Sequence, residues 1–95
     1  MDRLVIRAAH WQEMKVHIQG CNPDEACGLI AGTGSGIEKI YPVTNIDHSP
    51  HNFRMDAKEQ VNAMVSMEQL GLELVAIYHS HPQGPTYPSQ TDLSL

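Results

Sequence analysis

The chain has 95 residues, of which 41% are hydrophobic and 18% are charged, a composition typical of a soluble globular protein. This length predicts one small domain, spanning residues 1–95, that buries roughly 60–65% of its unfolded surface. A net charge of −5, with only six Lys and Arg, argues against nucleic-acid binding, and no apolar run is long enough to predict a membrane span.

The first residues lack the layout of a secretory signal peptide, because charged side chains interrupt the apolar stretch at residues 4–6. We therefore expect a cytoplasmic protein. Two cysteines are too few for a disulfide framework. We interpret Cys27 as a small buried residue in a strand and Cys21 as a spectator thiol near a helix end.

A short strand over residues 3–7 and a helix over residues 8–20 are the first predicted elements. Apolar residues at 8, 11, 14 and 18 recur at helical spacing, which places Trp11 and Met14 in the core. Gly20 and the following Asn-Pro pair end the helix. We expect His10 and His17 on or near its solvent-exposed surface.

Two apolar stretches, at residues 26–31 and 37–43, predict strands joined by the glycine-rich residues 32–36. A phosphate-binding loop is the alternative for these glycines, but no Lys-Ser or Lys-Thr follows them. A hairpin turn is therefore favoured.

Residues 45–54 are polar and predict a loop. Its histidines, His48 and His51, leave three interpretations open: a second metal site, a substrate-contacting loop, or a plain surface loop, the last being favoured. A capping box from Asp56 to Glu59 then predicts a helix over residues 57–70, whose methionines we interpret as core residues.

An apolar run rich in β-branched residues predicts a buried strand over residues 72–79. Strand side chains alternate between faces, so His79 and His81 project from the same face with Cβ atoms roughly 6.5–7 Å apart. Two such imidazoles can bind one metal ion, although the pattern is also common at the rim of a sheet. Asp92 could supply a third ligand, which leaves open the fourth position of a catalytic zinc site.

The tetrad from Ser89 to Asp92, Ser-Gln-Thr-Asp, is also a capping box, and it predicts a third helix that begins after Ser89. A cap of this kind would hold Asp92 rigidly in the first helical turn. The capping and metal-binding interpretations of these residues are therefore compatible.

The whole string from His79-Ser-His81-Pro to Ser89-x-x-Asp92 resembles the JAMM motif of the MPN+ zinc metalloproteases. Residues 23–32, Pro-Asp-Glu-Ala-Cys-Gly-Leu-Ile-Ala-Gly, resemble the family segment that carries an upstream glutamate, here Glu25. The resemblance covers most of the chain. The compact Pro-x-Glu-x-Cys-Gly form of this segment resembles the prokaryotic stand-alone branch of the family.

This resemblance implies an α/β fold, with a mixed β-sheet flanked by helices and related to the cytidine-deaminase-like architecture. Members of the family usually continue for several more strands after the aspartate. We therefore expect residues 1–95 to form a single domain that lacks the C-terminal strands. Its exposed sheet edge and apolar surface should lead to self-association, or to marginal stability and low activity.

The resemblance also implies a mechanism. His79, His81 and Asp92 would bind Zn²⁺, which lowers the pKa of a bound water toward ~7. Glu25 would act as the general base and return the proton to the leaving amine, while Ser89 would donate a hydrogen bond to the oxyanion.

The implied reaction is hydrolysis of a peptide or isopeptide bond at the C-terminal Gly-Gly tail of a ubiquitin-like or sulfur-carrier protein. The tail would bind by strand addition. The sequence does not choose between the two substrates. A non-catalytic MPN scaffold is one alternative, but such domains typically lose the metal ligands. A zinc deaminase is another, but its His-x-Glu and Pro-Cys-x-x-Cys motifs do not occur.

Overall fold

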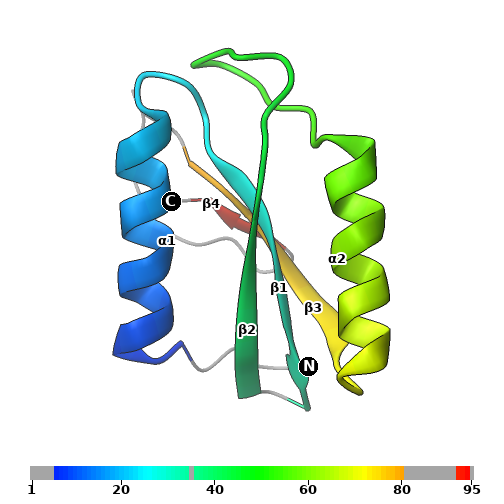
Figure 1. Cartoon of the computed structure of the whole chain (residues 1–95). Helices are drawn as coiled ribbons and strands as arrows, with labels where there is room; N and C mark the ends of the chain where they lie inside the picture. Colours follow the sequence, from blue (N-terminus) through cyan, green and yellow to red (C-terminus); the bar gives the residue numbers. More distant parts are fainter. Residues whose placement is uncertain (1–5, 35, 81–91, 95) are drawn as a thin grey trace.

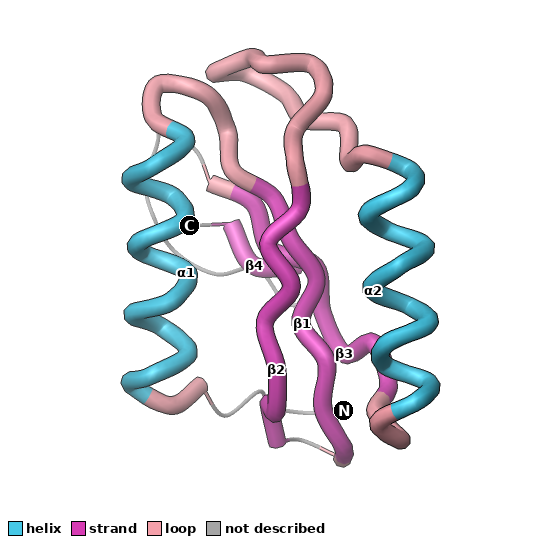
Figure 2. The backbone as a smooth tube through the Cα atoms, in the orientation of Figure 1, coloured by secondary structure: helices cyan, strands magenta, loops and turns pink. Residues whose placement is uncertain are grey.

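The computed structural model describes residues 6–34, 36–80 and 92–94. In chain order, their helices and strands are α1 (Ala8–Cys21), β1 (Cys27–Thr33), β2 (Gly36–Val43), α2 (Ala57–Gln69), β3 (Glu73–His79) and β4 (Asp92–Ser94). The sheet has the strand order β2-β1-β3-β4, with β1 antiparallel to both neighbours and β4 parallel to β3. Helix α1 lies on one face and α2 on the other (Figures 1 and 2). The predicted α/β class with a mixed sheet is confirmed.

The inner strand β1 is buried on both faces, as the predicted continuous apolar run requires. Its Ile30 packs in one cluster with Met14 of α1. Its Leu29 packs in the second cluster with Met67 of α2. The predicted hairpin is confirmed, because β1 and β2 pair in antiparallel register from Cys27↔Val43 to Thr33↔Gly36. Each helix therefore covers its own core, with the sheet between them.

The buried face of α1 differs from the predicted one. Met14 is fully buried, but Trp11 is 38% exposed, so its predicted place in the core is wrong. The expectation of a solvent-exposed His17 is also wrong: this side chain is half-buried, and its Nδ1 lies 2.7 Å from the hydroxyl of Tyr78. A buried tyrosine hydroxyl requires a hydrogen-bond partner, which explains why a polar residue faces the sheet here. Burial lowers the pKa of His17, and the charge of Glu59 partly opposes that shift.

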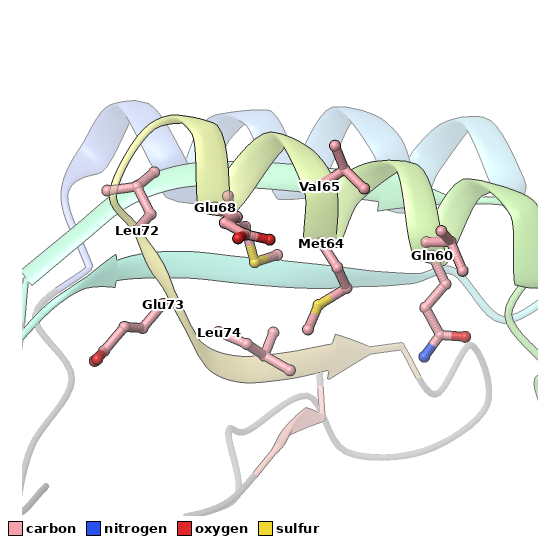
Figure 3. Close-up of a pocket in the computed structure, with 9 residues that line it drawn as sticks. Gln60, Met64, Val65, Glu68, Leu72, Glu73 and Leu74 are labelled. Carbon is pink, nitrogen blue, oxygen red and sulfur yellow. The ribbon is translucent and has the colours of Figure 1, made fainter.

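Helix α2 begins as predicted, because the Asp56 carboxylate accepts a hydrogen bond from the Glu59 N–H at 2.8 Å. Met67 is buried, but Met64 is 45% exposed, so the prediction that the methionines of this helix are core residues is wrong for Met64. Met64 instead reaches from α2 toward Leu74 of β3, in a groove of about 590 Å³ (Figure 3). Self-association through such exposed apolar surface remains a prediction.

The last two predicted elements, at the two ends of the chain, differ from the structure. Of the strand predicted over residues 3–7, the structure describes only Ile6 and Arg7, and these are not in a strand. The third helix, predicted after Ser89, is wrong at residues 92–94, which form β4. As a strand, residues 92–94 pair with the backbone N–H and C=O groups at the edge of β3. A helical turn at these residues would leave those edge groups of β3 unpaired. Within the described ranges, no helix is long and apolar enough to cross a membrane.

We predict opposite effects for alanine at two glycines. A Cβ at Gly32 would lie 1.9 Å from the carbonyl oxygen of Gly36, a clash with backbone that cannot move aside. Gly32→Ala should therefore lower the free energy of unfolding by roughly 1–3 kcal/mol. Gly20 in α1 has no heavy atom within 4 Å of the added Cβ, and Gly20→Ala should raise that free energy by about 0.4–1 kcal/mol. Urea unfolding of both variants measures these changes, and equal changes would contradict the steric account.

Candidate active site

Two segments meet where β1 begins and β3 ends. In the antiparallel register of these strands, Cys27 lies opposite His79. The pairing continues beyond the strands, because the Ala26 N–H donates to Ser80 Oγ at 2.8 Å and the Ser80 N–H donates to the Ala26 carbonyl at 3.0 Å. This pairing brings Glu25 next to His79, although they are 54 residues apart in sequence.

The pair formed by Glu25 and His79 is the centre of the candidate site. Oε1 of Glu25 lies 3.3 Å from Nδ1 of His79. Both side chains are buried, with relative exposures of 2% for Glu25 and 9% for His79. Glutamate is almost never fully buried unless it is paired. A buried carboxylate in contact with an imidazole can orient that ring, and it can accept and return protons in a space from which water is largely excluded.

The side chain of Asn45 links the loop that follows β2 to the backbone of Glu25. The Asn45 amide nitrogen donates to the carbonyls of Glu25 and Asn52, both at 3.1 Å. Its amide oxygen accepts from the N–H groups of Asp47 at 3.1 Å and Arg54 at 3.0 Å. These four bonds use the full hydrogen-bonding capacity of a buried asparagine side chain. The loop and the backbone of Glu25 are therefore held as one unit.

The loop makes two further contacts with the site. The Glu25 N–H donates to the carbonyl of Ser49 at 2.8 Å, which fixes the glutamate backbone from a second direction. The ring of Phe53 stacks on the ring of His79, with centroids 4.8 Å apart and planes inclined by 26°. The loop therefore contacts both members of the pair.

Cysteine chemistry is not supported at this site. Cys27 lies opposite His79 in the sheet, but its Sγ is directed at the carbonyl of Val43, 3.5 Å away. Burial, reinforced by the neighbouring Cys21, Glu25 and Glu59, raises the pKa of the Cys27 thiol to about 12. A raised pKa and a buried Sγ are typical of an unreactive structural cysteine. The prediction of Cys27 as a small buried strand residue is confirmed.

Of the predicted site residues, the structure describes the side chains of Glu25 and His79 and brings them together. His81 and Ser89 lie outside the described ranges. Asp92 is described in its backbone, where it pairs with Ile77 in the strand beside β3. Among the described side chains, no group of three His, Cys, Asp or Glu could hold a metal ion.

Within the described ranges, neither loop histidine belongs to a group of three or more His, Cys, Asp or Glu that could hold a metal ion. Both are exposed, and His48 Nδ1 lies 4.0 Å from a carboxylate oxygen of Asp24. The loop that carries them instead holds Glu25, through the carbonyl of Ser49 and the side chain of Asn45. Its identification as a loop is confirmed, and the contacts show that it also supports the site.

The structure therefore combines a mixed sheet between two helices with a buried Glu–His pair where β1 begins and β3 ends. The chain belongs to the family described as prokaryotic homologs of the JAB domain, whose model matches residues 7–95. The family resemblance read from the sequence is confirmed.

Relatives and a solved structure agree with this assignment. The CysO-cysteine peptidase of Mycobacterium tuberculosis is 44% identical over 97% of this chain and 64% of its own length. A probable TtuB-protein conjugate cleaving protease of Thermus thermophilus is 37% identical over 86% of this chain and 55% of its own. A desampylase of Pyrococcus furiosus is 33% identical over 88% and 60%. The chain therefore spans less than two thirds of these relatives.

The solution structure of a protein from Desulfitobacterium hafniense superimposes with a TM-score of 0.72. Its sequence is 36% identical, and the match covers 87% of this chain and 57% of that protein.

Three supporting residues were not predicted from the sequence: Asn45, Phe53 and Ser80. Asn45 carried a weak signal, because an asparagine shortly after a strand commonly accepts local hydrogen bonds from the following turn. Phe53 is the single phenylalanine of the chain and lies in a polar segment, so a packing role was open to inference. Ser80 gave no signal of its own between the two histidines.

We predict that Asn45→Ala loosens the loop and lowers the free energy of unfolding. The change leaves the buried carbonyl of Glu25 without its amide donor, and an unsatisfied buried polar group costs about 1–3 kcal/mol. The matched control is Asn52→Ala, whose exposed side chain makes one long contact, 3.5 Å to Asp47; this variant should stay within about 0.5 kcal/mol of the parent. Urea unfolding provides both values, and equal losses would show that Asn45 has no special role.

Proposed function

We propose that this chain forms the catalytic core of a zinc-dependent peptidase. It hydrolyses a peptide or isopeptide bond at the C-terminal Gly-Gly tail of a sulfur-carrier or ubiquitin-like protein. The observation that carries the proposal is the buried contact between Glu25 and His79 at the end of β3. The relatives support the substrate class, because they are named for carrier–cysteine and protein-conjugate cleavage.

His79, His81 and Asp92 would hold the zinc ion. The donor types fit, because two imidazoles and a carboxylate are common ligands of catalytic zinc. The backbone also supports the choice: β4 runs parallel to β3, with Asp92 opposite Ile77, two positions before His79. When bound, zinc would supply Lewis-acid activation of the attacking water and of the scissile carbonyl.

Glu25 is the proposed general base. Its carboxylate takes a proton from the attacking water and delivers it to the leaving amine. Burial keeps bulk water away from this transfer, and the bonds to Asn45 and Ser49 fix the backbone from which the carboxylate projects. Ser89 is assigned to the oxyanion on the motif alone, as a hydrogen-bond donor.

The observed contact also supports a second role for Glu25. Metal-binding histidines usually donate their other ring N–H to a carboxylate, which orients the ring. The 3.3 Å contact with Nδ1 would place Glu25 in that role and direct Nε2 to the metal. The two roles predict different results for a glutamine substitution, as described below.

Among the substrates, the proposal favours release of cysteine from a carrier protein. The M. tuberculosis CysO-cysteine peptidase is 44% identical, compared with 37% and 33% for the T. thermophilus and P. furiosus proteins. An extended Gly-Gly tail offers few side-chain contacts and would bind through its backbone.

We propose that the protein is cytoplasmic. Its two cysteines are unpaired, as expected in a reducing compartment.

We predict one zinc ion per chain. His79→Ala and Asp92→Ala should each remove it, because each deletes one of three protein ligands. The matched controls, His48→Ala and His51→Ala, change exposed histidines of the loop and should retain the metal. Elemental analysis of folded protein measures the zinc content. A parent chain without zinc would favour a non-catalytic scaffold, and zinc retained in both of the first variants would disprove the ligand set.

We predict that Glu25→Gln keeps the zinc and loses turnover. Glutamine has nearly the same size and still accepts a hydrogen bond from His79, but it cannot accept a proton. General-base catalysis typically contributes about 10²–10⁴-fold, so single-turnover cleavage of a Gly-Gly-linked substrate should fall by that factor. Near-normal turnover with normal zinc content would show that Glu25 only orients His79. Loss of zinc would contradict the general-base assignment and show that the Glu25 carboxylate is required for metal binding, as a ligand or through His79.

A further inference from the structure

One face of the His79 ring is covered by an aromatic side chain from the loop after β2. The ring of Phe53 lies 4.8 Å from the imidazole, centroid to centroid, at an inclination of 26°. This geometry is a stacked pair within the distance range in which aromatic rings attract one another beyond the burial of their surface. The contact joins a loop residue to the histidine that the proposed function assigns to the metal.

The position of Phe53 is fixed by the backbone on either side of it. The N–H of the next residue, Arg54, donates to the Asn45 side chain at 3.0 Å, and the Arg54 carbonyl accepts from Ile46 at 2.9 Å. The carbonyl of the preceding residue, Asn52, accepts from the Asn45 amide at 3.1 Å. Hydrogen bonds thus hold the loop immediately before and after Phe53, which fixes the backbone from which its ring projects.

Glu25 and Phe53 restrain the imidazole in different ways. Glu25 contacts Nδ1 and thereby selects which of the two ring nitrogens faces its carboxylate. Phe53 packs on the face of the ring and thereby restrains rotation about the Cβ–Cγ bond. Together, these contacts restrain the imidazole from two directions.

We propose that Phe53 is a positioning residue for His79, holding its imidazole in the orientation that binds the metal. The inference rests on the proposed function, because it takes His79 to be a metal ligand. Phe53 itself touches neither metal nor substrate in this role. Supporting residues behind a metal ligand typically contribute about 10–100-fold to metal affinity, and a stacking contact is expected at the lower end of that range.

A purely structural role is the alternative. Phe53 also packs against the core cluster on the α2 face, which contains Cys27, Leu29 and Val43. Met55 packs against the same cluster, and its side chain has no aromatic ring that could stack on His79. Met55→Ala therefore reproduces a loss of core packing while leaving the stacked pair intact, which makes it the matched control.

The test compares Phe53→Leu, Phe53→Tyr and Met55→Ala with the parent chain. Chelator competition measures zinc affinity, and the imidazole ¹⁵N signals of His79 in the zinc-free chain report how well the ring is ordered. Phe53→Leu should bind zinc about 10-fold more weakly and should shift or broaden the His79 signals. Phe53→Tyr keeps the aromatic face and should restore both. Met55→Ala should bind zinc like the parent even though it melts at a lower temperature.

Three results would overturn the proposal: parental zinc affinity in Phe53→Leu, a loss in Met55→Ala as large as in Phe53→Leu, or a raised KM in Phe53→Leu with unchanged zinc affinity. The last would make Phe53 a substrate contact. A parent chain that binds no zinc would instead disprove the proposed function. In that case, the His79 signals of the zinc-free chains would still decide whether Phe53 orders the ring.

Discussion

The antiparallel pairing of β1 with β3 is the constraint on which the site depends. Its register places Cys27 opposite His79, and the bonds between Ala26 and Ser80 extend the pairing past the ends of the strands. Glu25 therefore reaches His79 because of where the two backbones are locked together. A shift of this register by one residue would turn His79 to the opposite face of the sheet.

Around this pairing, the two faces of the sheet have different tasks. The α1 face is a core in which Tyr78 lies over Gly28, where a Cβ would come within 2.2 Å of the tyrosine ring, and its hydroxyl bonds with His17. The α2 face carries Cys27 and continues to the site, where the loop after β2 contributes Phe53 and Asn45. The residues adjacent to His79 in the chain, Tyr78 and Ser80, anchor the strand to α1 and to β1.

Much of the fold was predictable, because helical and strand spacing of apolar residues marks α1, β1, β2, α2 and β3 to within two residues. The errors in predicted burial share one physical origin. Trp11 and Met64 are apolar but exposed, while His17 is polar but half-buried, since the facing partner rather than the residue type decides burial. The spacing of apolar residues along a helix fits more than one buried face. In α1, the contact with Tyr78 of β3 goes with the face that carries His17.

Part of the candidate site could also be predicted from the sequence. Glu25 and His79 could be proposed from the motif, and their contact in the structure agrees with that pairing. The contributions of Asn45 and Phe53 could not, because each acts through contacts that exist only after the loop has closed over the end of the sheet. A polar segment without periodicity predicts a loop and says nothing about what that loop holds.

The separation in sequence between the two halves of the site affects how the chain folds. The β1–β2 hairpin and the two helices are built from local contacts, whereas β1 meets β3 only after the long connection over residues 34–72 has been closed. Local contacts form at a lower entropic cost than distant ones, so the hairpin and helices are expected to form before this long-range pairing. Glu25 and His79 are therefore expected to come together late in folding. A partly folded chain would retain most of its secondary structure and yet lack the contact between these two side chains.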